Sequence, residues 1–246
     1  MLWAFWAWQP WEFDFIERKP EQPLPRIDPD SKKLFGKGTR VLVITAHPDD
    51  SEFYIGGTLH LLGKSAEIHQ IICTDGDKGY YWFFADAKEN RRVRRIEANA
   101  AKDAWHGRSL EFLGYPDGRL RVRDELVDRI AERIRALRPE YVLAFDGEFP
   151  PRLSHQDHRR AGDAALLAAK TAGVPLWLMM FSTNAANYYV DITDVWPDKE
   201  ELLKIHASQF HGERLERVTN MVASSAEKDG EAANVTHAEG FRCIKL

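Results

Sequence analysis

The sequence predicts an α/β fold of the doubly wound type, in which helices cover both faces of a mostly parallel sheet. Short runs of β-branched and apolar residues recur along the chain, and segments of helix length separate them. The first run, RVLVIT at residues 40–45, is apolar almost throughout, which is typical of a parallel strand buried on both faces. Consecutive strands that are joined through helices form βαβ units and lie parallel to one another.

From residue 40 onward, strands and helices are expected to alternate. The predicted strands cover residues 40–45, 67–74, 109–113, 141–145, 175–180 and 188–192. The predicted helices cover residues 52–62, 85–105, 123–137, 158–171 and 199–209. A chain of 246 residues is close to the upper size of a single hydrophobic core, so we expect one domain.

The first 36 residues have a different composition. Six large aromatic residues lie among the first thirteen: Trp3, Phe5, Trp6, Trp8, Trp11 and Phe13. Four prolines follow between residues 20 and 29 and favour an extended chain. We therefore predict an aromatic and proline-rich extension over residues 1–36 and a compact domain over residues 37–246.

The aromatic segment is too short and too aromatic for a signal peptide. Tryptophan is common at protein interfaces and at membrane interfaces, because it is apolar and carries one hydrogen-bond donor. We expect an arm that packs on its own domain or on another subunit of a homo-oligomer, with membrane contact as the alternative.

Composition narrows the partners and the location of the protein. The 34 basic and 38 acidic side chains are mixed along the chain, so no basic surface is expected to collect the phosphates of a nucleic acid. No run approaches the roughly 20 apolar residues of a spanning helix, and we expect a cytoplasmic protein. The run Arg91, Arg92, Arg94 and Arg95 is typical of a solvated helix face. Cys73 ends an apolar run and is expected to be a small buried residue.

Two polar segments follow predicted strands. AHPDDSE, residues 46–52, comes directly after the first strand, and SHQDH, residues 154–158, comes after strand 141–145. Ligands bind at the carboxyl ends of the strands in open sheets of this kind. Either segment alone is more typical of a capped helix start, because aspartate is a common N-cap residue. The presence of both at strand ends of one sheet favours a metal site, and neither GxGxxG nor GxxxxGK[ST] occurs to suggest a phosphate loop.

The residue types in these two segments suit a hydrolytic metal centre. Such a zinc site needs three protein ligands and one open position, and it combines imidazole nitrogen with carboxylate oxygen. His47 and Asp50 could close on one ion around a proline-bent turn, and His158 could be the third ligand. Asp49 and His155 would then lie beside the ion, where a carboxylate can take a proton from water and an imidazole can either stabilise an oxyanion or protonate the departing amine.

The same segments resemble the LmbE-like de-N-acetylases, also called the PIG-L family. AHPDDSEFYIGGTL and SHQDH carry the resemblance, and shorter landmarks follow in family order: TDGDKG, FLGYPDG, YVDIT, HASQF and AEGFR. The family includes deacetylases of N-acetylglucosaminyl-phosphatidylinositol, mycothiol and bacillithiol biosynthesis. Two departures are a bulky Tyr54 where small residues are frequent and Gln156 where proline is usual.

The resemblance implies a Rossmann-like fold and a Zn²⁺ ion on His47, Asp50 and His158, with Fe²⁺ as an alternative metal. It implies Asp49 as the general base for a metal-bound water nucleophile, and His155, charged, as the partner of the tetrahedral intermediate.

Three further residues receive roles from the resemblance. Asp157 would orient His155, and Arg94 and Asp117 would hold sugar hydroxyls. The expected activity is hydrolytic removal of the acetyl group from a small N-acetylglucosamine-type sugar or its conjugate. The alternatives are a zinc amidase that acts on a larger N-acyl or thiol conjugate and a non-catalytic sugar- or lipid-binding module.

Overall fold

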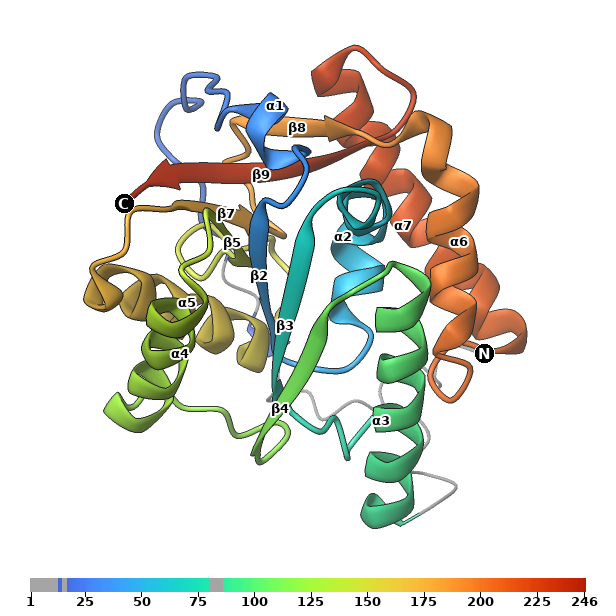
Figure 1. The fold of residues 1–246 in the computed structure, drawn as a ribbon. Helices are drawn as coiled ribbons and strands as arrows, with labels where there is room; N and C mark the ends of the chain where they lie inside the picture. The colour runs from blue at the N-terminus through green and yellow to red at the C-terminus, as the bar shows by residue number, and fades with distance from the viewer. Residues whose placement is uncertain (1–12, 15–16, 80–85) are drawn as a thin grey trace.

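A seven-stranded sheet with the order β4-β3-β2-β5-β7-β9-β8 forms the centre of the protein (Figure 1). The computed structural model describes residues 13–14, 17–79 and 86–246. The strands of this sheet are β2 (Arg40–Thr45), β3 (Glu67–Thr74), β4 (Ser109–Tyr115), β5 (Tyr141–Phe145), β7 (Trp177–Phe181), β8 (Tyr188–Asp191) and β9 (Ala238–Lys245). Neighbouring strands from β4 to β7 are parallel, whereas β9 is antiparallel to both of its neighbours. The predicted α/β fold with a mostly parallel sheet is confirmed.

Helices cover both faces of the sheet. They are α1 (Ser31–Leu34), α2 (Asp50–Gly63), α3 (Ala87–Ala104), α4 (Asp124–Leu137), α5 (Gln156–Ala172), α6 (Trp196–Ile205) and α7 (Gly212–Ala233), with a short 3-10 turn η3 (Thr193–Val195) before α6. Helices α4 and α5 lie on one face, and α2, α3, α6 and α7 lie on the other (Figure 1). The helices predicted within residues 52–171 are all present, with ends that differ by at most two residues.

The order of the strands places the site. From β2 the chain moves outward through β3 to β4, and it then returns to the opposite side of β2 as β5. The sheet therefore changes direction between β2 and β5, which is where ligands bind in open α/β sheets. Val41 of β2 pairs with Ile68 of β3 and with Tyr141 of β5, and β5 is buried along its whole length. The loops after β2 and β5, which carry the two predicted metal-binding segments, consequently emerge side by side.

Helix α6 begins and ends earlier than predicted. It ends at Ile205 because the following residues make contacts with distant parts of the chain. His206 is fully buried, and its Nε2 lies 2.9 Å from Glu52 Oε2. The backbone N–H and the hydroxyl of Ser208 both donate hydrogen bonds to Glu97. These acids hold residues 206–210 in a turn, so the prediction of helix up to residue 209 was wrong.

Two long elements were absent from the predicted set. Helix α7 buries Val218, Val222, Ala226 and Gly230, four residues apart each time, and the rest of its surface is mostly polar. So narrow an apolar stripe is a weak sequence signal. Strand β9 is antiparallel and enters between β7 and β8, so it is not part of a βαβ unit.

The described part of the extension packs on the sheet. The backbone N–H of Ile27 donates to the carbonyl of Asn187, and the Tyr141 hydroxyl donates to the carbonyl of Pro29. Leu34 of the short helix α1 is fully buried in the main core. The predictions for the aromatic residues Trp3 to Trp11 lie outside the described residues. Among the residues that the structure describes, no helix is long and apolar enough to cross a bilayer.

A buried ion pair supports a break in α2. Ile55 departs from helical geometry with φ −134° and ψ 24°, which leaves backbone groups of the helix without their usual partners. Glu239 of β9 accepts hydrogen bonds from the N–H groups of Gly57 and Thr58. Lys199 Nζ lies 2.6 Å from Glu239 Oε1 and donates to the carbonyl of Tyr54. The pair therefore satisfies both sides of the break and fixes the first turns of α2, which bear on the site.

We predict that Glu239→Ala destabilises the protein by about 3–5 kcal/mol, because the buried side chain of Lys199 would lose its carboxylate partner. The free energy of unfolding in urea measures the effect. Glu111→Ala is the control, because the bidentate pair of Glu111 with Arg133 is partly exposed and is expected to contribute at most about 1 kcal/mol. Equal losses in the two variants would contradict a special role for the buried pair.

Candidate metal centre and active site

The loop after β2 presents His47 and Asp50 together. Asp50 Oδ2 accepts backbone N–H groups from Ala46 at 3.0 Å and from His47 at 2.7 Å, so the carboxylate is held by the loop that it follows. Burial raises the pKa of Asp50, but the neighbouring His158 and His47 outweigh burial and hold that pKa well below its usual range. Asp50 is therefore a buried, ionised and oriented carboxylate.

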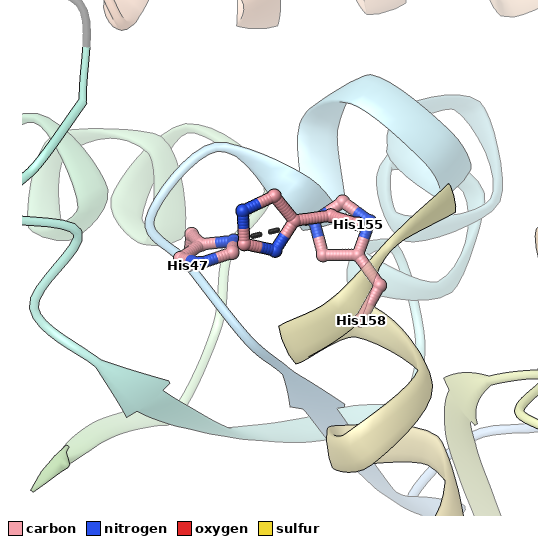
Figure 2. Close-up of side chains that lie close together, drawn as sticks. All are labelled: His47, His155 and His158. Atoms are coloured by element: carbon pink, nitrogen blue, oxygen red, sulfur yellow. Dashed lines mark hydrogen bonds between the residues drawn. The ribbon is translucent and has the colours of Figure 1, made fainter. Parts of the chain in front are cut away.

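The loop after β5 leads to His155 and His158. His155 ends the short strand β6 (Ser154–His155) and is the N-cap of α5, where its Nδ1 accepts the backbone N–H of Asp157 at 3.1 Å. His158 lies in the first turn of α5, and its ring stacks on Phe145 with ring centroids 4.2 Å apart. Figure 2 shows the rings of His47, His155 and His158 gathered at one point.

The three predicted metal ligands meet. His47 Nδ1 lies 3.2 Å from His158 Nε2, and His158 Nε2 lies 3.0 Å from Asp50 Oδ1. His47 Nδ1 lies 3.7 Å from Asp50 Oδ2. Two nitrogen ligands at about 2.0–2.1 Å from a tetrahedral zinc ion are about 3.3 Å apart, so the observed spacing fits one such ion. The structure brings this predicted set together from two loops more than 100 residues apart in sequence.

Two overlapping groups also have the spacing of metal ligands. One ring nitrogen from each of His47, His155 and His158 lies within 4.8 Å of the others, as do potential ligand atoms of His47, Asp117 and Asp157. In His47, Nδ1 faces His158, whereas Nε2 lies 3.0 Å from Asp117 Oδ1 and 3.4 Å from Asp157 Oδ2. A metal-binding imidazole commonly gives its second nitrogen to a carboxylate. This geometry favours Nδ1 of His47 as the ligand atom and the two carboxylates as its outer partners.

Negative charge is concentrated around His47. Asp50, Asp117 and Asp157 are each no more than 6% exposed. Burial lowers the pKa of His47, but these carboxylates, Asp117 foremost, outweigh burial and raise that pKa well above its ordinary value. Buried carboxylates in this number favour a cation among them. The donor set and its charge therefore fit a divalent metal ion.

Asp49 lies beside this ligand set in an unusual backbone conformation. Its φ of 106° is positive, which non-glycine residues rarely adopt and which is concentrated at functional sites. Asp49 precedes α2, yet its side chain makes no cap hydrogen bond. Instead, Oδ1 lies 3.0 Å from Arg94 Nη2. Burial raises the pKa of Asp49 to about 6, with Arg94 opposing the rise and Asp50 adding to it.

Arg94 differs from the rest of its basic run. Arg91, Arg92 and Arg95 are exposed, as predicted, but Arg94 is 4% exposed. Its guanidinium donates to the carbonyls of Gly76 and Pro48 in addition to its ion pair with Asp49. These contacts of Arg94 therefore anchor Asp49 and the two loops around it. The predicted contact of Arg94 with a sugar hydroxyl stays a prediction.

Asp117 and Asp157 are also held by protein groups. Asp117 accepts the backbone N–H of Lys78 and faces His47, and its predicted sugar contact likewise stays a prediction. The carboxylate of Asp157 accepts the N–H groups of Gly118 and Leu120 and faces His47 as well. The backbone N–H of Asp157 donates to Nδ1 of His155 and so contributes to the orientation of that ring.

Asp75, Asp77 and Arg119, which received no role from the sequence, line a cleft together with Asp117. The cleft, of about 230 Å³, opens at the carboxyl ends of β3 and β4, and Arg91 is also among its lining residues. Arg91 Nε lies 3.1 Å from Asp75 and its Nη2 lies 2.9 Å from Asp77, so most of this charge is paired. The sequence signal that could have indicated this cleft is the position of TDGDKG, which follows a strand at the same sheet edge as the metal ligands.

An α/β sheet with two imidazoles and a carboxylate converging at its change of direction defines a class of Rossmann-like proteins with a candidate metal centre. The chain belongs to the PIG-L family, because the model of that family, described as GlcNAc-PI de-N-acetylase, matches residues 42–169. The predicted family resemblance is confirmed.

Three similar proteins extend the comparison over most of the chain. The chain is 27% identical to the diacetylchitobiose deacetylase of Thermococcus kodakarensis, over 95% of this chain and 93% of that protein. It is 25% identical to the 4-oxalmesaconate hydratase of Pseudomonas putida, over 82% and 88% respectively. The solved N,N'-diacetylchitobiose deacetylase of Pyrococcus horikoshii has a TM-score of 0.82 and 27% identity, and the match covers 87% of each chain.

We predict that Asp117→Asn weakens metal binding about 10- to 100-fold, because His47 would lose the charged partner of its Nε2. Competition of zinc-loaded protein with a chelator measures the affinity, and thermal unfolding checks that the variant is folded. Asp191→Asn, at an exposed position of the edge strand β8, is the matched control and should bind metal as the wild type does. Unchanged affinity in Asp117→Asn would remove Asp117 as the outer partner of the ligand.

Proposed function

We propose that the protein is a metal-dependent hydrolase that removes the acetyl group from an N-acetylglucosamine-type sugar or its conjugate. The observation that carries the proposal is a carboxylate outside the ligand set, Asp49, next to the converging His47, Asp50 and His158. Similarity to a diacetylchitobiose deacetylase over 95% of the chain supports the same chemistry. A small N-acetylated sugar is accordingly the proposed substrate.

Zn²⁺ is the proposed metal, and Fe²⁺ is the alternative, because two imidazoles and a carboxylate suit both ions. When bound, the ion would polarise the amide carbonyl and lower the pKa of a water ligand to about 7. His47, Asp50 and His158 would hold it, with Asp117 and Asp157 behind His47.

Asp49 is the proposed general base. Burial raises its pKa to about 6, near the range in which a carboxylate both accepts and returns a proton. Its ion pair with Arg94 holds the carboxylate in place despite the positive φ. Asp49 would take a proton from water during attack on the acetyl carbon and pass one to the sugar nitrogen as the C–N bond breaks.

His155 is the proposed partner of the oxyanion. Its Nδ1 accepts the N–H of Asp157, so Nε2 is the nitrogen that would donate to the oxyanion. A hydrogen bond from Nε2 to the oxyanion would stabilise the tetrahedral species more than the substrate. The charged His155 that the family resemblance implies is kept in this proposal.

The acyl group is proposed to be acetyl because an aromatic side chain narrows the site. Tyr54 lies four residues after Asp50 and so projects from the same face of α2. Its ring centroid is 5.7 Å from that of His158 and 5.1 Å from that of Phe145. Phe181 packs behind it at 5.9 Å. We infer that this aromatic cluster limits the size of the acyl group that can lie beside the metal ligands, which favours acetyl over the large acyl groups of the amidase alternative.

The deciding experiment is a release assay on purified protein with measured metal content. We expect acetate from N-acetylglucosamine, its disaccharide or a conjugate, loss of activity after chelation, and recovery with Zn²⁺ or Fe²⁺. Amine release from bulky N-acyl substrates alone would favour the amidase. Absence of bound metal and of any metal-dependent hydrolysis would favour a binding module, and hydration of 4-oxalmesaconate would favour the activity named for the Pseudomonas relative.

We predict that Asp49→Asn retains the metal and lowers kcat about 10²- to 10⁴-fold, because the amide cannot accept the proton. Metal analysis and steady-state kinetics are measured on the same preparation. A rate equal to that of the wild type would remove Asp49 as the base, and loss of the metal would assign it a structural role.

We predict that Tyr54→Ala raises the ratio of kcat/KM for N-butyrylglucosamine over N-acetylglucosamine by about 10-fold, because the narrowing ring is absent. Tyr54→Phe keeps the ring and is the matched control, with a ratio close to that of the wild type. An unchanged ratio in the alanine variant would show that Tyr54 does not limit the acyl group.

A further inference from the structure

The extension reaches the active site through a second, two-stranded sheet. Strand β1 (Phe13–Asp14) pairs antiparallel with β6, and Phe13 lies opposite His155 in the register. Asp14 lies opposite Ser154. In the described part of the chain, β1 is the strand with which β6 pairs. The backbone next to the proposed oxyanion residue is therefore joined to the N-terminal extension.

His155 lies where an exposed loop becomes a helix. Leu153, two residues earlier, is 59% exposed, and residues 146–153 connect β5 to β6 without regular structure. On the helical side, His155 is held through its Nδ1 by the N–H of Asp157. On the loop side, Ser154 and His155 form β6, and within the described residues the strand that pairs with β6 is β1. The position of the imidazole thus depends on contacts from both sides.

The strand is continuous with a segment that is anchored to the domain. The side-chain amide of Asn184 donates to the carbonyl of Arg18 at 3.2 Å and to the carbonyl of Pro150 at 2.7 Å. The backbone N–H of Asn184 donates to the carbonyl of Phe149. Asn184 therefore joins the extension to the loop that leads to β6.

Farther along, the Arg26 guanidinium lies 4.2 Å from the ring centroid of Tyr189 in the edge strand β8. With the backbone hydrogen bond between Ile27 and Asn187, this contact ties the extension to the main sheet. In the sequence, β1 is therefore followed by residues 18–27, which contact the domain at several points.

We propose that β1 is a positioning element of the active site, which holds the backbone of His155 so that the imidazole reaches the oxyanion. This inference rests on the proposed function. Displacement of a catalytic group by about 1 Å can cost roughly 100-fold in rate. Loss of the pairing should lower kcat and leave substrate affinity and the metal largely unchanged, because the ligands His47, Asp50 and His158 are anchored by other contacts.

The test uses the full-length chain with Phe13→Pro and Asp14→Pro combined, which removes both backbone N–H donors of β1. The matched control combines Phe13→Ala and Asp14→Ala, which changes the side chains and keeps the backbone donors. We expect the proline variant to lose about 10- to 100-fold in kcat, with KM, metal content and Tm close to those of the wild type, and we expect the alanine variant to retain its rate.

A cycle with His155→Ala separates positioning from general damage. If β1 acts through His155, the proline substitutions should lower kcat no further in the His155→Ala background. Equal rates in the proline and alanine variants, loss of metal or folding in the proline variant, or fully additive losses with His155→Ala would each overturn the inference. A wild-type protein that hydrolyses no acetamido sugar would overturn the proposed function itself, and the inference with it.

Discussion

The candidate site depends on the contacts of the His47 imidazole. One of its nitrogens lies 3.2 Å from His158, and the other lies 3.0 Å from Asp117, so a single ring joins the ligand set to the carboxylates behind it. An imidazole can bind an ion and a carboxylate at the same time only through different nitrogens, and the ring must therefore be fixed in one orientation. The loop between β2 and α2 provides this orientation, because Asp50 takes the N–H groups of Ala46 and His47.

Much of the polar structure around the site serves to hold acidic groups in place. Arg94 joins Asp49 to the carbonyls of Pro48 and Gly76, and so couples the loop after β2 to the loop after β3. Deeper in the protein, Glu52 meets both His206 and the indole N–H of Trp105. These buried contacts stabilise the loop in which Asp49 has a positive φ and is followed by the carboxylates of Asp50 and Glu52. Their shared physical basis is that a buried charge is costly unless it is paired or hydrogen-bonded.

Family membership and site geometry answer different questions. The fold is shared with proteins named as deacetylases and with one named as a hydratase, so it does not by itself select a reaction. The proposed reaction therefore rests on the site. In that proposal, Asp49 acts as the base, His155 as the oxyanion donor and Tyr54 as the limit on the acyl group. The strand pairing of Phe13 with His155 adds a part of the chain that lies outside the matched residues 42–169.

The sequence by itself determined the α/β class, the parallel strands from β2 to β7 and the identity of the residues that would meet at the site. These were readable because strand periodicity and the order of βαβ units are local properties, and because ligands bind at the carboxyl ends of parallel strands. The end of α6, the narrow apolar stripe of α7 and the antiparallel β9 were not readable, because distant acids and strands decide them.

Only the tertiary structure decided which nitrogen of His47 faces the ligands and that Arg94 and Asp117 hold other site residues. It also decided that the N-terminal extension pairs with the strand of His155. Each of these depends on the direction of a side chain or on the pairing of segments far apart in the chain, and residue type and spacing along one segment do not encode either.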